Sequence, residues 1–261
     1  MPANWIDIPQ ISFNALLLLE RVQLSWLPKW GLPETELAIA LQANPAVEWY
    51  MRSKCPETNG WLDKVMIDDK HPSNPDVIRQ AEITVLQSID DLIVYAVAPD
   101  AYDKLAFHGW DSGELTSIAD FNGKTVIDIG AGTGRLAFIA ARLCRTLFAV
   151  EPVDNLRAFI KDKAARLGLS NVYCIDGLIA DIPFPDRFAD ITMCAHVFGD
   201  EPAEEYREMM RATKPGGMII LCPGNNDIDN ERHQFLIEKG FEWSSFEEPG
   251  NGIKRKYWKT M

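Results

Sequence analysis

Hydrophobic positions follow two different spacings along the chain, and the change falls near residue 120. Upstream of it, apolar side chains recur every three or four residues, which is typical of amphipathic helices. This spacing predicts helices over residues 14–27, 33–42 and 75–97. Asn74 and Pro75 stand where a helix start favours a capping side chain followed by proline. We therefore expect residues 1–120 to form a mainly helical extension or cap.

Downstream of residue 120, short apolar runs alternate with longer amphipathic stretches. The runs predict strands over residues 124–129, 146–150, 172–175, 189–197 and 218–222. The stretches predict helices over 154–167, from 202 onward and over 229–239, and one more after the first strand with Leu136, Ile139, Ala140 and Leu143 facing inward. Two last strand-like runs, 241–246 and 254–260, predict an antiparallel hairpin. The alternation predicts a doubly wound α/β fold, in which ligands bind beyond the carboxyl ends of the parallel strands.

Composition and charge exclude several classes of protein. The chain has 261 residues, of which 47% are hydrophobic and 25% charged, so it is long enough and apolar enough to bury a core. Its net charge is −12, and residues 1–123 hold 18 acids against 8 bases. The one short basic cluster, residues 254–256, is interpreted as a solvated strand face, so nucleic acid is disfavoured as a partner.

Membrane, disulfide and metal sites are also disfavoured. Apolar runs such as residues 15–19 are far shorter than the ~18 residues of a membrane span, and no secretory leader is recognised. Five cysteines without paired spacing predict neither a disulfide framework nor a zinc site. We expect a soluble, cytoplasmic protein that makes no membrane contact and holds no metal.

The most informative segment is the glycine-rich turn after the first predicted strand, where residues 128–135 read DIGAGTGR. Glycines at alternate positions let the backbone turn tightly and approach a ligand. Arg135 stands where a dinucleotide fingerprint places its third glycine, and Asp128 precedes the turn. Glu151 ends the second strand, 17 residues after Gly134, where a carboxylate can accept hydrogen bonds from both ribose hydroxyls. This pattern predicts a cofactor that contains a nucleoside.

These motifs resemble those of the class I S-adenosylmethionine-dependent methyltransferases. The resemblance covers residues 120–225, and the predicted hairpin extends it to residue 261. It implies a seven-stranded, mostly parallel Rossmann-like sheet with an antiparallel last strand over residues 121–261, S-adenosylmethionine as cofactor and S-adenosylhomocysteine as product. The positions that match the family's cofactor-binding residues are Asp128, Gly130, Ala131, Gly132, Gly134, Glu151, Pro152, Asp176, Gly177 and Ala195. Asp181 competes with Asp176 for the contact near the adenine.

The methyl acceptor is expected to enter beyond the fourth strand, near His196. An imidazole with an ordinary pKa near neutrality suits a general base, so His196 is the candidate catalytic residue. Tyr102 and Trp110, upstream of the glycine turn, either line the site or pack in a core. The motifs of nucleobase-methylating enzymes, Asn-Pro-Pro-Tyr and Pro-Cys, are absent from the sequence, which together with the acidic balance favours a small-molecule acceptor.

Two other functions remain compatible with the sequence. One is an NAD(P)-dependent oxidoreductase on a Rossmann sheet. Three features argue against this function: Arg135, Asp128 and the closing hairpin. The other is a protein of methyltransferase fold that binds the cofactor without catalysing transfer. The acceptor atom and the oligomeric state stay open.

Overall fold

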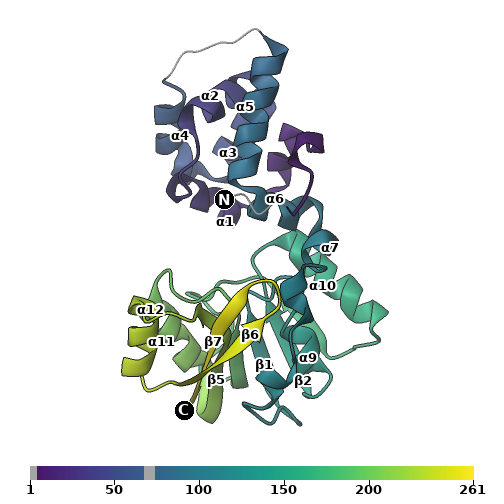
Figure 1. Ribbon diagram of the computed structural model, residues 1–261, viewed down its shortest axis with the longest axis vertical. Helices are drawn as coiled ribbons and strands as arrows, with labels where there is room; N and C mark the ends of the chain where they lie inside the picture. The colour runs from purple at the N-terminus through teal and green to yellow at the C-terminus, as the bar shows by residue number, and fades with distance from the viewer. Residues whose placement is uncertain (1–4, 68–73) are drawn as a thin grey trace. The chain divides into compact units, whose positions relative to one another are not determined.

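The computed structural model describes residues 5–67 and 74–261 and divides the chain into two compact units, Met1–Tyr102 and Asp103–Met261 (Figure 1). The division falls at residue 102, whereas the sequence placed it at 120. The intervening segment packs on the sheet of the second unit, because Trp110, Leu115 and Phe121 are buried in the same cluster as the first strand.

The first unit is helical. Its helices are α1 (Arg21–Trp26), α2 (Glu34–Ala43), α3 (Pro45–Lys54), α4 (Asn59–Val65), α5 (Pro75–Ser88), α6 (Asp90–Val97) and α7 (Pro99–Tyr102), with short 3-10 helices η1 (Ile8–Gln10), η2 (Phe13–Leu18), η3 (Leu27–Lys29) and η4 (Pro56–Thr58). Leucine side chains dominate its core, and several of them are completely buried, including Leu19, Leu37, Leu41 and Leu62. A helical first unit agrees with the spacing of its apolar residues.

Two of its predicted helices are interrupted. Residues 14–27 divide into η2 and α1 because the backbone is extended at Leu19 and Glu20, which carries Leu19 into the core. Residues 75–97 divide at Ile89, which is fully buried and whose backbone (φ −130°, ψ 28°) leaves the helical region. In both places the burial of one large side chain competes with helix continuity.

The start of α5 agrees with the prediction. The side chain of Asn74 accepts a hydrogen bond from the backbone N–H of Asp76, and Pro75 occupies the first turn. This satisfies one of the N–H groups that a helix start leaves without a partner.

The second unit is built on one seven-stranded sheet. Its strands are β1 (Thr125–Ile129), β2 (Thr146–Val150), β3 (Val172–Ile175), β4 (Ala189–Cys194), β5 (Thr213–Asn226), β6 (Glu242–Glu248) and β7 (Gly252–Thr260). They lie in the order β3-β2-β1-β4-β5-β7-β6, and β7 runs antiparallel to both of its neighbours while the other pairings are parallel (Figure 1). The predicted doubly wound α/β fold with an antiparallel last strand is confirmed.

Helices cover both faces of this sheet. They are α8 (Gly113–Thr116), α9 (Ala137–Ala141), α10 (Asp154–Arg166), α11 (Pro202–Ala212) and α12 (Glu231–Glu238), with η5 (Ala106–Gly109) before them. Alternate residues of β1 point to opposite faces, so Val126 packs with α9 and α10 and Ile127 packs with α11 and α12. Leu143, expected to face inward, is 47% exposed because α9 ends two residues before it.

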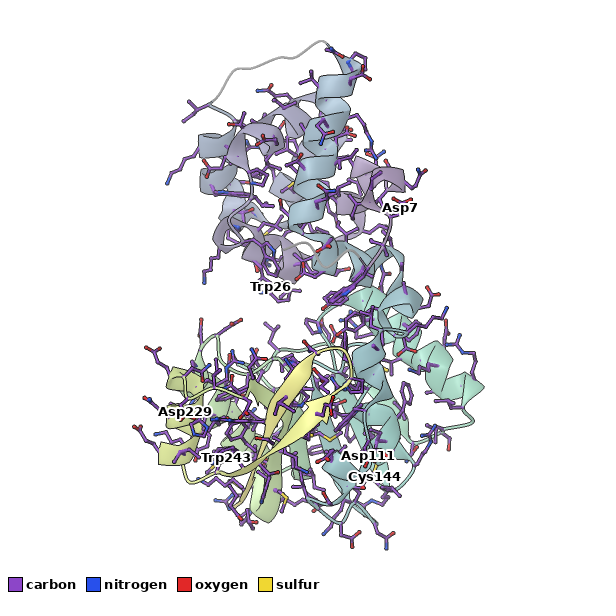
Figure 2. The ribbon with its side chains drawn as sticks, viewed as in Figure 1. Asp7, Trp26, Asp111, Cys144, Asp229 and Trp243 are labelled. Atoms are coloured by element: carbon purple, nitrogen blue, oxygen red, sulfur yellow. The ribbon has the colours of Figure 1, made fainter. Side chains whose placement is uncertain are left out.

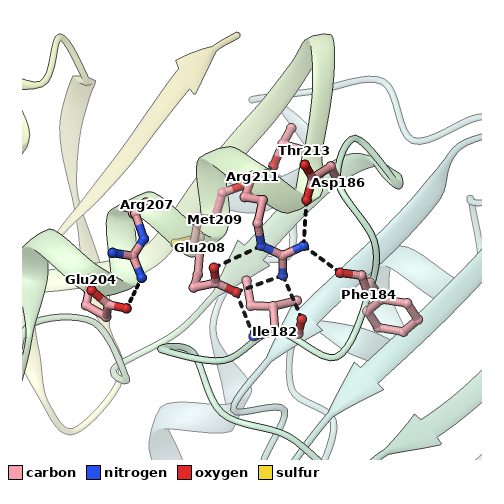
Figure 3. Close-up of polar contacts among 9 residues, drawn as sticks. All are labelled: Ile182, Phe184, Asp186, Glu204, Arg207, Glu208, Met209, Arg211 and Thr213. Atoms are coloured by element: carbon pink, nitrogen blue, oxygen red, sulfur yellow. Dashed lines mark hydrogen bonds and ion pairs between the residues drawn. The ribbon is translucent and has the colours of Figure 1, made fainter.

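The loop that leads into β4 is held by Arg211 of α11 (Figure 3). Its guanidinium donates hydrogen bonds to the carbonyl oxygens of Ile182 and Phe184, at 2.8 and 2.7 Å, and pairs with Glu208 at 2.7 Å. Glu208 in turn accepts a hydrogen bond from the backbone N–H of Ile182. The loop before β4 is therefore fixed to α11, the helix that follows β4 in the sequence.

The basic cluster of residues 254–256 is buried, so its interpretation as a solvated strand face was wrong. Lys254, Arg255 and Lys256 are each about nine-tenths buried on β7. Arg255 pairs with Asp227 and Asp229 at 2.7 and 2.6 Å and lies over the ring of Trp243; Figure 2 labels Asp229 and Trp243. Lys254 and Lys256 donate to Asn226 and to Glu114. Arg255 and Lys256 thus pair with acids of the same unit, and Lys254 donates to a neutral amide.

Candidate cofactor and acceptor site

The glycine turn follows β1 at the carboxyl edge of the sheet. Gly130, Gly132 and Gly134 all have positive φ, at 63°, 57° and 89°, which is a region that favours glycine. A Cβ on Gly130 would lie 2.3 Å from a methyl group of Val197, and a Cβ on Gly134 would lie 2.2 Å from the ring of Phe138. Both the backbone conformation and the close packing therefore require glycine at the first and third positions.

Glu151 holds this turn from the end of β2. Its Oε2 accepts a hydrogen bond from the Gly132 N–H at 2.8 Å, and its Oε1 accepts one from the Val153 N–H at 2.9 Å. The residue is 4% exposed. Burial raises the pKa of its carboxyl to about 7, although the two N–H groups and the Arg157 charge act to lower it. The predicted ribose-binding acid thus contacts the glycine turn directly.

Asp128, at the end of β1, is also buried, with an exposed fraction of 2%. Its Oδ2 has no hydrogen-bond partner within residues 5–67 and 74–261, and the same is true of the buried Thr133 hydroxyl. Burial raises the pKa of Asp128 well above its usual range, and the nearby Glu151 carboxyl adds to the rise. Buried polar atoms left without partners are uncommon, because each loses its hydrogen bonds to water.

The segment after β3 carries the positions predicted to lie near the adenine. Asp176 follows the strand directly, is 74% exposed in its side chain, and pairs with Arg157 at 3.1 Å. Arg157 also donates to the backbone oxygen of Glu151, so the ends of β2 and β3 are linked. A Cβ on Gly177 would lie 2.7 Å from Pro183, so this position requires glycine. The backbone of Asp181 bridges to Leu178, and both aspartates remain candidates.

His196 lies beyond β4, two residues after the strand ends. Its backbone has a positive φ of 62°, and its N–H donates to the Pro223 oxygen of β5. Its Nε2 lies 3.3 Å from Oε1 of Glu248, at the end of β6. Because Val197 packs on Gly130, the structure brings His196 close to the glycine turn. Ala195 precedes it and packs, partly buried, against the core.

Two acidic residues with prominent contacts here were not predicted. Glu248 lies 52 residues from His196 in the sequence, and no local motif connects the two. Glu205 of α11 is 2% exposed and accepts hydrogen bonds from the backbone N–H groups of Gly199, Asp200 and Glu201. The sequence could have indicated this role, because Glu205 lies in the first turn of a helix, where carboxylates are favoured.

Comparison with known proteins finds a methyltransferase domain in the second unit. Residues 127–221 match the family model described as a methyltransferase domain. The chain is 23% identical over 159 residues to an uncharacterized methyltransferase of Anoxybacillus flavithermus, which covers 59% of this chain and 71% of that protein. An uncharacterized methyltransferase of Geobacillus thermodenitrificans is 24% identical over 177 residues, and this match covers 64% of this chain and 78% of that protein. Together these matches support a class I S-adenosylmethionine-dependent methyltransferase, with its methyltransferase domain over residues 127–221.

The chain is also similar to a solved structure. It is a SAM dependent methyltransferase from Aquifex aeolicus, 20% identical, with a TM-score of 0.48 over 61% of this chain and 96% of that one. In the described part of the chain, no helix is long and apolar enough to cross a membrane. The same residues contain no group of three or more His, Cys, Asp or Glu side chains that could hold a metal ion.

The residues of the methyltransferase site fit the family's cofactor, S-adenosylmethionine. That molecule presents a positively charged methionine end and a ribose with two hydroxyl donors. The site offers a buried aspartate oxygen and a buried threonine hydroxyl that lack partners among the described residues, beside a glutamate on the backbone of the turn. The hydrogen-bond donors and the positive charge of the cofactor therefore match the acceptor oxygens that the site offers.

Proposed function

We propose that this methyltransferase transfers the methyl group of S-adenosylmethionine to a small-molecule acceptor, and that it does so in the cytoplasm. The observation that supports this most strongly is the convergence at the carboxyl ends of β1 and β2. There, Glu151 of β2 holds the turn of residues 128–134, which carries three glycines with positive φ and an Asp128 oxygen without a partner in the described residues. Ligands of doubly wound sheets bind at this edge.

Each cofactor contact has a proposed residue. Glu151 accepts hydrogen bonds from the two ribose hydroxyls, and Asp128 faces the charged methionine end across the turn formed by residues 130–134. Asp176 and Gly177, with Pro152, line the adenine and ribose side, and Ala195 lines the cofactor from the end of β4. Burial has removed most water from the carboxylate of Glu151, and the two ribose hydroxyls would supply hydrogen-bond donors in its place. This gain supports a role for Glu151 in binding.

The acceptor is proposed to enter beside His196, on the far side of the glycine turn from Glu151. The acidic balance of the chain, with a net charge of −12, supports a small molecule rather than a phosphate backbone. The buried state of residues 254–256 strengthens this, because the one basic cluster noted in the sequence is neutralised internally. His196 accepts the proton that the acceptor loses during transfer.

Calorimetric titration tests the cofactor assignment. S-adenosylmethionine, S-adenosylhomocysteine and NAD are titrated separately into the purified protein, and micromolar binding of the two adenosyl ligands without NAD binding is expected. Binding of NAD alone would overturn the proposal.

The Glu151→Ala variant tests the ribose contact in the same assay. Losing two hydroxyl hydrogen bonds to a carboxylate should weaken binding by ~1.5–3 kcal/mol, or roughly tenfold to a hundredfold in Kd. An unchanged Kd would refute the role of Glu151.

A further inference from the structure

Three segments of the methyltransferase domain meet at the carboxylate of Glu248. Its Oε1 lies 2.5 Å from Nη2 of Arg135, which follows the glycine turn, and 3.3 Å from Nε2 of His196. Its Oε2 accepts a hydrogen bond from the side-chain amide of Asn251. The Glu248 side chain is fully buried, whereas the His196 side chain is 43% exposed. A buried carboxylate therefore lies directly behind a solvent-accessible imidazole.

We propose that Glu248 positions His196 as the proton acceptor, and that the methyl acceptor consequently carries a proton on its nucleophilic atom, as a hydroxyl, thiol or amine does. This inference rests on the proposed function. An ionised carboxylate only accepts hydrogen bonds, so it keeps the proton of the neutral imidazole on Nε2. The lone pair of Nδ1 is then directed away from Glu248, and Nδ1 has no hydrogen-bond partner in the described part of the chain.

Arg135 keeps Glu248 ionised in spite of its burial. Burial acts to raise the pKa of Glu248, but the hydrogen bond with His196 and the charge of Arg135 outweigh it and lower the pKa to about 2. The guanidinium is itself 7% exposed and lies over the ring of Trp110 at 4.7 Å. A buried carboxylate without such a cation would take up a proton and cease to be a pure acceptor.

The proposed step balances in atoms and charge. When bound, S-adenosylmethionine supplies the methyl group and becomes a neutral thioether that keeps the electron pair of the broken C–S bond. The lone pair of the acceptor atom forms the new bond to the methyl carbon, and its proton passes to Nδ1 of His196. Glu248 stabilises the imidazolium, which returns the proton to water through its exposed ring edge. A nucleophile without a proton would give His196 nothing to accept.

A purely structural role for Glu248, as a clamp between the hairpin and the glycine turn, predicts no particular state of His196. Imidazole NMR of the ¹⁵N-labelled protein with bound S-adenosylhomocysteine at pH 8 separates the two roles. His196→Asn identifies the resonances, and asparagine suits the position because it tolerates positive φ. We expect the wild-type His196 proton on Nε2, in slow exchange with water.

Two variants test what holds that proton. Glu248→Gln should speed the exchange of the Nε2 proton about tenfold, because a charge-assisted hydrogen bond becomes a neutral one. Asn251→Ala, the matched control, removes the side-chain partner of the opposite carboxylate oxygen, Oε2, and should leave the exchange unchanged. A proton on Nδ1 in the wild type, or exchange insensitive to Glu248→Gln, would overturn the inference. If that variant does not fold, the double variant Arg135→Met with Glu248→Met removes both charges and must show the same loss of protection.

An activity readout addresses the acceptor class. The loaded enzyme is offered ¹³C-methyl-labelled S-adenosylmethionine with hydroxyl, thiol and amine compounds and with thioethers and tertiary amines. Methylation of only the proton-bearing compounds, reduced about a hundredfold in His196→Asn, is expected. Methylation of a thioether at a rate unchanged in that variant refutes the inference. Failure of S-adenosylhomocysteine to bind in a prior titration counts against the proposed function instead, so the two failures are distinguishable.

Discussion

Cofactor affinity should depend on pH through Glu151, and the structure sets both the direction and the size of the effect. The carboxyl has a pKa of about 7 in the free protein because burial disfavours its charge. Ribose hydroxyls donate hydrogen bonds, so they favour the ionised form, and binding expels a proton. The affinity for the cofactor is therefore highest above pH 7, where Glu151 is ionised, and it decreases as the pH falls through 7.

The magnitude follows from the ionised fraction. With a pKa of about 7, roughly nine-tenths of the free protein is ionised at Glu151 at pH 8 and roughly one-tenth at pH 6. The Kd for S-adenosylhomocysteine should then increase about tenfold between these values, equivalent to about 1.4 kcal/mol. The pKa of Asp128 is also raised by burial, so a variant that removes only the titration of residue 151 isolates the share of Glu151.

Glu151→Gln supplies that control. Its amide keeps the shape of the side chain but does not titrate, so the pH dependence due to residue 151 should disappear while Asp128 is left unchanged. The assay is calorimetry at pH 6, 7 and 8 in two buffers of different ionisation enthalpy, which also counts the protons released. A wild-type Kd that is flat between pH 6 and 8, or a profile identical in Glu151→Gln, would refute the reasoning.

Three further predictions concern the scaffold. Gly130→Ala should lower the stability by about 1–3 kcal/mol more than Gly216→Ala in urea unfolding, because both glycines have positive φ but Gly216 meets nothing within 4 Å in the described residues; equal losses would show that packing at Gly130 is unimportant. Arg211→Met should cost roughly 2–4 kcal/mol, because it leaves two carbonyl oxygens and a carboxylate without their donor, and a change below ~0.5 kcal/mol contradicts the bonding shown in Figure 3. Asn74→Ala should lower the stability of the first unit by about 1 kcal/mol through loss of the cap, with Asn74→Ser as the variant that retains it.

The fold and the glycine turn were predictable because local sequence decides them. The turn glycines, the acid at residue 151 and the alternating strands and helices each leave a signal within about 20 residues, and the structure has them in the predicted order. Glu248 was not predictable, since its contact with His196 spans 52 residues and depends on the hairpin returning to the sheet edge. The charges of residues 254–256 looked solvent-exposed because their partners lie on other elements, and only the assembled sheet places those acids beside them.

The order of strands has a consequence for how the protein is synthesised. β7 is inserted between β5 and β6, and within the described sheet β6 pairs only with β7. While the chain is being made, β6 therefore has no strand to join until residues 252–260 have been added. The carboxylate of Glu248, at the end of β6, reaches Arg135 and His196 only after that addition. A nascent chain interrupted in its last segment would carry the glycine turn but lack the carboxylate behind His196, so the cluster of Arg135, His196 and Glu248 forms only once the sheet is complete.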